Sequence, residues 1–249
     1  MITSSPDHQV KRFTAFHALP WVAHAYTGFG AVLALAATLA VFDSRARDVL
    51  LLLSAATFVD ATDGWLARAL RVKERLPGYD GARLDDIVDY LTYVFVPVLF
   101  VIHEGLLPPG WELEIGALVL LASAYGFGQA DAKADTTDYF FTGFPSYWNI
   151  VAFYIYVLRL PLVVNAAVLA VLAVLVFVPI RYVYPSRTRT LRRTTLVLGS
   201  LWAVAMLIAI WRLPRTNGPF LPLSLVFPVY YAALSLYLHA RDATTKITK

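Results

Sequence analysis

The stretch LLLLSAATFVDATDGWLAR, residues 50–68, places two carboxylates and a guanidinium at the end of an apolar run. Such a run is typical of a membrane-spanning helix, in which ionisable side chains are costly. If the whole chain is a membrane protein, the primary interpretation of these acids is therefore that they belong to a functional site.

The composition favours a polytopic helical membrane protein. Of the 249 residues, 59% are hydrophobic and 15% are charged, whereas a soluble domain carries about 25% charged residues. The chain has no cysteine, which excludes a disulfide framework, a thiolate metal site and a cysteine nucleophile. The net charge of +4 comes without a basic patch interleaved with aromatic residues, so we expect no nucleic-acid partner.

Long apolar segments separated by short polar loops predict an all-α fold, a polytopic integral membrane bundle of about eight transmembrane helices. We expect the spans at 21–42, 48–70, 84–104, 112–130, 145–160, 162–184, 194–212 and 219–239. The domains are then an N-terminal segment, the membrane domain and a short tail, at residues 1–20, 21–240 and 241–249.

The distribution of lysine and arginine predicts that both termini are cytoplasmic. With the N-terminus inside, the inner segments carry about three times as many of these residues as the outer loops, as the positive-inside rule requires. Residues 60–68 then lie in the cytoplasmic third of the second span, and the third span starts at the same depth. We therefore expect the acids to face the cytoplasm.

Carboxylates on two neighbouring helices are predicted to share one small volume, beside glycines that leave room for a ligand. They are Asp60, Asp63, Asp85 and Asp89, and the glycines are Gly64 and Gly81. Their spacing puts each set on one helix face, and antiparallel packing would bring the two faces together. Divalent cations such as Mg²⁺, Mn²⁺ or Ca²⁺ would neutralise the charge, and two metals about 4 Å apart can share carboxylates. The alternative is that the acids pair with basic side chains of the adjoining loop.

The full pattern reads Asp60-x2-Asp63-Gly64-x2-Ala67-Arg68, then Gly81-x3-Asp85-x3-Asp89. It resembles the signature of the CDP-alcohol phosphatidyltransferase family, and the likeness covers residues 15–240. Twelve residues separate Arg68 from Gly81, more than in most of the family. This longer form is similar to a bacterial branch that uses choline.

The resemblance implies a reaction and roles for individual residues. It implies that the four aspartates bind two divalent ions, Mn²⁺ or Mg²⁺, and that Asp89 is also the catalytic base. Gly64, Arg68 and Gly81 would lie along the nucleotide of CDP-diacylglycerol. The expected reaction forms phosphatidylcholine from CDP-diacylglycerol and choline and releases CMP, at the inner membrane of a bacterium among membrane lipids. The family also implies a homodimer.

Aromatic residues are expected to bind the quaternary ammonium group of choline, which has no N–H to donate. The candidates lie in DYFFTGFPSYWN, residues 138–149, and are Tyr139, Tyr147 and Trp148, with Tyr90 and Tyr93 in reserve. The alternative interpretation of this stretch is an interfacial aromatic belt.

Two other functions stay open. A sister enzyme would use another acceptor alcohol, such as inositol phosphate, glycerol phosphate or serine, and a phosphorylated acceptor would need a basic pocket near Asp89. A cation transporter would need acids near the midplane and a polar path on both sides. The outward halves of the second and third spans, LLLLSAATF and VPVLFVI, have few polar groups.

Overall fold

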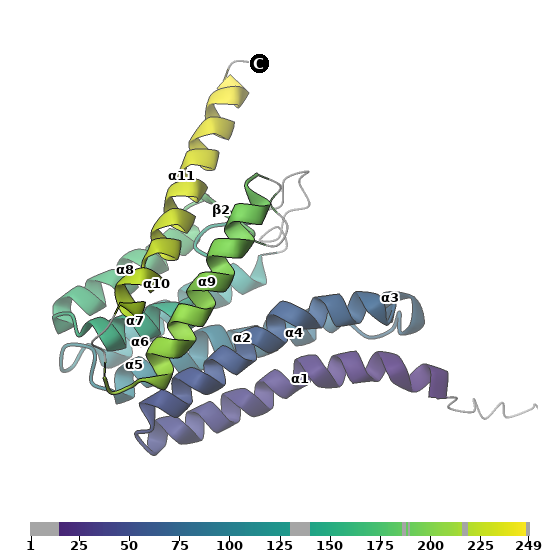
Figure 1. Ribbon diagram of the computed structural model, residues 1–249, viewed down its shortest axis with the longest axis horizontal. Coiled ribbons are helices and arrows are strands. Elements are labelled where there is room, and N and C mark those ends of the chain that lie inside the picture. Colours follow the sequence, from purple (N-terminus) through teal and green to yellow (C-terminus); the bar gives the residue numbers. More distant parts are fainter. Residues whose placement is uncertain (1–14, 130–139, 186–187, 189, 216–218, 248–249) are drawn as a thin grey trace, which may run out of the picture.

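The computed structural model describes residues 15–129, 140–185, 188, 190–215 and 219–247, and they are mostly helical (Figure 1). The elements are α1 (Ala15–Phe42), α2 (Ala46–Ala69), α3 (Val72–Arg75), α4 (Gly81–Asp89), the π-helix η1 (Tyr90–Phe95), α5 (Val96–His103), α6 (Glu112–Gly128), β1 (Phe140–Thr142), α7 (Trp148–Leu158), α8 (Leu162–Phe177), β2 (Arg181–Val183), α9 (Arg192–Trp211), α10 (Phe220–Ser224) and α11 (Val226–Ile247).

Within these described ranges, five helical segments are long and apolar enough to cross a membrane, and two shorter apolar helices accompany them. The long segments are Leu19–Phe42, Ala46–Ala69, Gly81–His103, Arg192–Trp211 and Phe220–Arg241. The prediction of a polytopic helical membrane protein is therefore confirmed.

Helices occur at all eight predicted positions, but those in the middle of the chain are shorter than expected. The helix predicted at 145–160 is α7, which has 11 residues, and the one predicted at 162–184 is α8, which has 16. At 1.5 Å per residue, α7 is roughly 16 Å long, about half of a bilayer's hydrocarbon thickness. Length and composition alone therefore do not make α7 a complete span.

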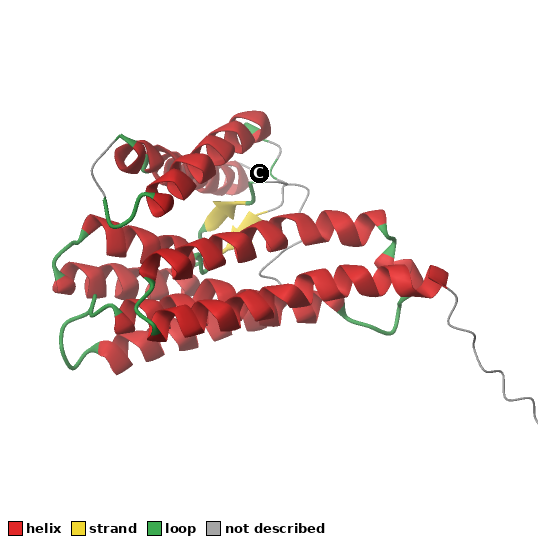
Figure 2. Cartoon of the chain, turned by 60° about the horizontal axis from the view of Figure 1, so that its bottom comes forward, coloured by secondary structure: helices red, strands yellow, loops and turns green. Residues whose placement is uncertain are grey.

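The all-α prediction needs one correction, because a small two-stranded sheet accompanies the helices. Strands β1 and β2 pair antiparallel, with Phe140 opposite Val183 and Thr142 opposite Arg181 (Figure 2). The helix predicted to continue to residue 184 ends early because Pro179 disfavours helical backbone at the preceding residue. Val178 is accordingly extended, at φ −85° and ψ 123°, and the chain is free to pair as β2.

The pair α1 and α2 forms an antiparallel hairpin beside the rest of the bundle (Figures 1 and 2). Ala34, Ala37 and Ala40 on α1 are all buried. Small side chains at this spacing let two helix backbones approach closely, as in many membrane bundles. The close approach fixes the depth at which the polar end of α2 lies.

The third apolar segment is one continuous helical rod built from α4, η1 and α5. Its π-helical part ends just before Pro97, which has no N–H for the Tyr93 carbonyl and would crowd it in a regular α-helix. Widening of the helix over Tyr90–Phe95 accommodates this proline, and such π-helical turns are frequent at functional sites.

Helices α9 and α11 rise at a steep angle from the other helices (Figure 1). Strand β2 is bonded to α11 because the Val183 N–H donates to Ser235 Oγ at 3.1 Å and the Arg181 N–H donates to His239 Nδ1 at 3.3 Å. These two bonds therefore attach α11, near the C-terminal end of the chain, to the region of β2, which lies near the acids.

Candidate metal and substrate site

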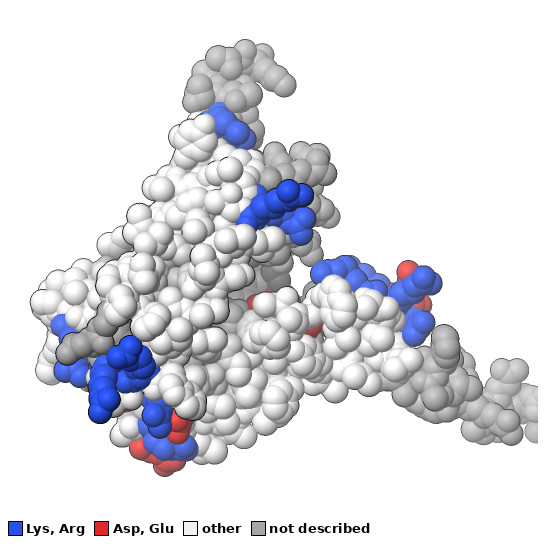
Figure 3. Space-filling model, viewed as in Figure 1, with Lys and Arg blue, Asp and Glu red and all other residues white. Residues whose placement is uncertain are grey.

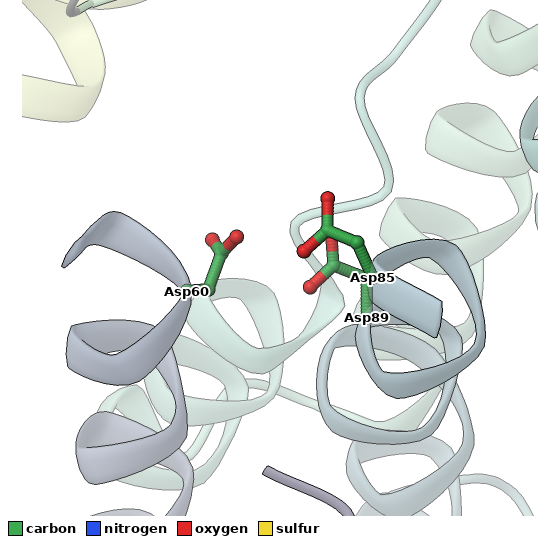
Figure 4. Close-up of side chains that lie close together, drawn as sticks. All are labelled: Asp60, Asp85 and Asp89. Atoms are coloured by element: carbon green, nitrogen blue, oxygen red, sulfur yellow. The ribbon is translucent and has the colours of Figure 1, made fainter. Parts of the chain in front are cut away.

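Three aspartates from two helices point toward one another (Figure 4). Asp60 comes from α2, and Asp85 and Asp89 come from α4. One carboxylate oxygen from each lies within 4.8 Å of the others, and all three side chains are partly buried. Figure 3 shows acidic atoms on the floor of a hollow between α2 and the raised helix α9.

Local sequence explains why α4 presents its acids here. Asp80 caps the helix, since its Oδ1 accepts hydrogen bonds from the N–H groups of Ala82 at 3.1 Å and Arg83 at 3.3 Å. This capping satisfies backbone donors that have no partner within the helix. The start of α4 is thus fixed, and Asp85 and Asp89, four residues apart, project from one face.

The chemistry of this donor set fits a divalent metal. Three carboxylates at this distance repel one another, and the repulsion grows as water is excluded. Hard cations such as Mg²⁺ and Mn²⁺ prefer oxygen ligands of this type. The cluster of Asp60, Asp85 and Asp89 can therefore hold a metal ion.

Asp63 is not one of the three clustered acids. Its side chain is 8% exposed, and its Oδ2 accepts a 2.7 Å hydrogen bond from Thr27 Oγ1 on α1. The preceding residue, Thr62, is hydrogen-bonded to Tyr26, which is also on α1, at 2.8 Å. The sequence pattern grouped Asp63 with the other acids, whereas tertiary contacts with α1 occupy one of its oxygens.

Tyr93 is attached directly to the acidic cluster. It lies four residues after Asp89 in η1, is 8% exposed, and donates a 2.7 Å hydrogen bond to Asp60 Oδ2. Asp60 and Asp89 also act electrostatically on its hydroxyl group. A buried donor of this kind fixes the orientation of a carboxylate ligand.

The residues predicted to contact a nucleotide lie at the same end of the bundle. A Cβ atom on Gly64 would lie 3.3 Å from Arg68 Nη1, so the Arg68 side chain extends back over Gly64. A Cβ atom on Gly81 would lie 2.7 Å from Cε1 of His24 on α1. An alanine at position 81 would therefore require the His24 ring to move, independently of any ligand.

The predicted aromatic residues have separate surroundings. Tyr147 caps α7, and its ring centroid lies 6.1 Å from that of Tyr93. Trp148 is 2% exposed in the core and donates from Nε1 to Ser123 Oγ at 2.7 Å. Tyr90 donates to the Leu120 carbonyl at 2.9 Å. Tyr139 lies outside the described residues.

Several neighbours of the site could not be found from sequence. Thr27 and His24 come from α1, and Tyr231, whose ring centroid lies 6.4 Å from that of Tyr147, comes from α11. Each is far along the chain from the residues it contacts and belongs to no spacing pattern. Only the packing of the helices brings them to the acids.

The fold and the site together define a polytopic membrane protein with a candidate divalent-metal centre on two neighbouring helices. A scan against protein-family models finds no match. Curated relatives, in contrast, align over most of the chain, and those described next all carry the name phosphatidylcholine synthase.

The relative from Legionella pneumophila is 38% identical over 224 residues, 87% of each chain. The one from Pseudomonas aeruginosa is 37% identical over 222 residues, 89% of this chain and 92% of that protein. The one from Bradyrhizobium diazoefficiens is 35% identical over 252 residues, which cover 100% of this chain and 91% of the relative. The chain belongs to the phosphatidylcholine synthase family, a group of CDP-alcohol phosphatidyltransferases.

Proposed function

We propose that the protein transfers the phosphatidyl group of CDP-diacylglycerol to choline and releases CMP. The observation that carries this proposal is the match to phosphatidylcholine synthases over nearly the whole chain. The cluster of Asp60, Asp85 and Asp89 supplies the chemistry that such a transfer needs. The substrates are CDP-diacylglycerol and choline, and the products are phosphatidylcholine and CMP.

Two divalent ions, Mn²⁺ or Mg²⁺, are proposed for the site, held by Asp60, Asp85, Asp89 and Asp63. For Asp63 to be a ligand, it would use the oxygen that Thr27 does not occupy or release that hydrogen bond. When bound, the ions neutralise the negative charge of the pyrophosphate and so favour departure of CMP. Gly64, Arg68 and Gly81 are proposed to contact the nucleotide, with Arg68 placing its charge near phosphate.

Asp89 is proposed as the general base. The choline oxygen forms a bond to the phosphorus that carries diacylglycerol, and its proton passes to the Asp89 carboxylate. The bond from that phosphorus to the bridging oxygen breaks, and CMP leaves with the electron pair. The partly buried cluster keeps Asp89 close to Asp60 and Asp85, so the base lies beside the residues that orient the pyrophosphate.

The proposed location is the inner membrane of a bacterium, with about eight membrane segments, both termini cytoplasmic and the site facing the cytoplasm. Lysine and arginine lie at both ends of the bundle in Figure 3, so the proposed orientation rests on the larger number of these residues in the segments assigned to the cytoplasm. A homodimer is a further proposal that follows from the family resemblance.

Purified protein tests the function directly. With CDP-diacylglycerol and Mn²⁺ or Mg²⁺, we expect choline to give CMP and phosphatidylcholine, and excess EDTA to abolish the reaction until metal is restored. Serine, glycerol phosphate and inositol phosphate serve as matched acceptors. CMP release with one of these but not with choline would favour a sister enzyme and refute the proposal.

A further inference from the structure

Tyrosine rings from four separate elements form a continuous wall that begins at the acidic cluster. This tyrosine wall consists of Tyr93, Tyr147, Tyr231 and Tyr182, from η1, the N-terminal end of α7, α11 and β2. Successive ring centroids lie 6.1, 6.4 and 6.3 Å apart. Its first member donates a hydrogen bond to Asp60, so the wall and the carboxylates are parts of one site.

The middle of the wall has the geometry of a cation site. The rings of Tyr147 and Tyr231 are inclined by 60° with centroids 6.4 Å apart. The rings are too close to admit a cation between them, but a cation lying against both can be within about 6 Å of each centroid, the range in which aromatic faces attract cations. Tyr182 stacks on Tyr231 at 20° and extends the wall on the other side.

The members of the wall are buried or partly buried. Tyr93 and Tyr182 are 8% and 9% exposed, whereas Tyr147 and Tyr231 are only partly buried beside the hydrophobic core clusters. Removal from water strengthens attraction between a cation and a ring. The two central rings therefore keep some free surface within an otherwise dry surrounding.

The wall lies beside the acidic cluster. Asp60 and Asp89 both act on the Tyr147 hydroxyl group across the site. A quaternary ammonium group at Tyr147 and Tyr231 would be attracted by the aromatic faces, whereas metal ions held by the acidic cluster would offset the charge of its carboxylates. Tyr147 packs beside Tyr93, which bonds to Asp60, so an ammonium group at Tyr147 could leave the choline hydroxyl group on the side of the acidic cluster.

The wall is held in place by ring packing, including the stack of Tyr182 on Tyr231, and by contacts of the elements that carry the rings. Ser235 on α11 accepts a hydrogen bond from the Val183 N–H of β2, and this bond fixes Tyr182 relative to Tyr231. Leu234 and Leu238 pack with Phe140 and Val183 behind the rings. The cluster of tyrosines is therefore preorganised, which lowers the cost of binding.

We infer that Tyr231 and Tyr182, together with Tyr147, form the binding site for the trimethylammonium group of choline and determine acceptor specificity. The inference rests on the proposed function and deepens it, because Tyr231 and Tyr182 lie far outside the aromatic stretch at residues 138–149. Trp148 has no part in this site, since its ring is in the core and its Nε1–H is bonded to Ser123.

The test compares Tyr231→Leu, which removes the ring, with Tyr231→Phe, which keeps it. Each variant is assayed for CMP release with choline and with 3,3-dimethylbutan-1-ol, a neutral alcohol of the same shape. Tyr237→Leu is the matched control, because Tyr237 is on the same helix and is 63% exposed. Tyr182→Leu provides a second ring deletion if Tyr231→Leu does not fold.

We expect Tyr231→Leu to raise KM for choline by about tenfold or more and to leave KM for CDP-diacylglycerol unchanged. Its KM for the neutral alcohol should not change, so the preference for choline shrinks. Tyr231→Phe should retain most of the choline affinity that Tyr231→Leu loses, and Tyr237→Leu should behave like the unaltered protein. An unchanged KM for choline in both ring deletions, or an equal rise for the neutral alcohol, overturns the inference. Failure of the unaltered protein to use choline instead refutes the proposed function.

Discussion

Tyr93 Oη donates a 2.7 Å hydrogen bond to Asp60 Oδ2, although the two residues lie on different helices. The bond joins the π-helical part of the third apolar segment to the end of α2. It occupies one oxygen of Asp60 and leaves the carboxylate oriented toward Asp85 and Asp89 (Figure 4). Tyr93 is thus a positioning residue for the candidate metal centre.

Replacing Tyr93 by phenylalanine should weaken metal binding. The Tyr93→Phe variant keeps the ring but removes the donor, so Asp60 loses its fixed orientation. Loss of such an outer hydrogen bond reduces metal affinity by about tenfold or more. The measurement is the Mn²⁺ concentration that gives half-maximal CMP release, together with direct titration of Mn²⁺ binding by electron paramagnetic resonance.

Tyr90→Phe is the matched control for Tyr93, because it removes a tyrosine hydroxyl that bonds to the Leu120 carbonyl in the same π-helical segment. Its metal affinity should not change. Equal losses of affinity in both variants would mean that the effect comes from η1 as a whole and that Tyr93 does not position Asp60.

Substitution of Asp89 should separate chemistry from binding. Asp89→Asn keeps the shape of the side chain but cannot accept the choline proton, so we expect CMP release to fall by about 100-fold or more. CDP-diacylglycerol should still bind, as measured by equilibrium binding of the labelled lipid. Asp60→Ala should instead lose both metal and lipid binding, and near-normal turnover in Asp89→Asn would exclude Asp89 as the base.

Gly81 can be tested for its packing role against its proposed nucleotide role. Gly81→Ala would place a Cβ atom 2.7 Å from His24 Cε1, which should displace α4 and lower CMP release. Adding His24→Ala removes the clash, and His24 Nε2 has no hydrogen-bond partner among the described residues, so the substitution breaks no hydrogen bond of that atom. The double variant should therefore recover most of the activity lost in Gly81→Ala.

Gly78→Ala controls for the backbone effect, since no described atom lies within 4 Å of its added Cβ, and it should leave CMP release unchanged. The double variant could instead stay as inactive as Gly81→Ala and show a raised KM for CDP-diacylglycerol. Position 81 would then need a glycine mainly because the nucleotide approaches its backbone closely.

The orientation of the chain can be measured with single cysteines, because the natural sequence contains none. We expect Glu74→Cys, beside the predicted cytoplasmic end of the site, to resist an impermeant thiol reagent in intact cells. Pro109→Cys, in the loop before α6, should be labelled under the same conditions. Both positions are exposed in the structure, so the reverse labelling pattern would invert the proposed topology.

The sequence alone determined the class of fold and the three acids of the candidate metal-binding cluster. Apolar runs of membrane length have few alternatives to a helix, because backbone polar groups in lipid must be satisfied within the segment. Helical periodicity then placed Asp85 and Asp89 on one face, and the pairing of neighbouring helices brought Asp60 to them. The length of an apolar run and the helical spacing of residues are local properties, which can be read directly from the sequence.

Only the tertiary structure decided which groups surround the acids. The bonds of Thr27 to Asp63 and of Tyr93 to Asp60 join separate helices, and the contact of Tyr147 with Tyr231 joins α7 to α11. Local periodicity carries no information on such pairs, because they depend on the depth and rotation at which whole helices pack. The acids were therefore predictable from spacing, whereas their hydrogen-bond donors and the tyrosine wall were not.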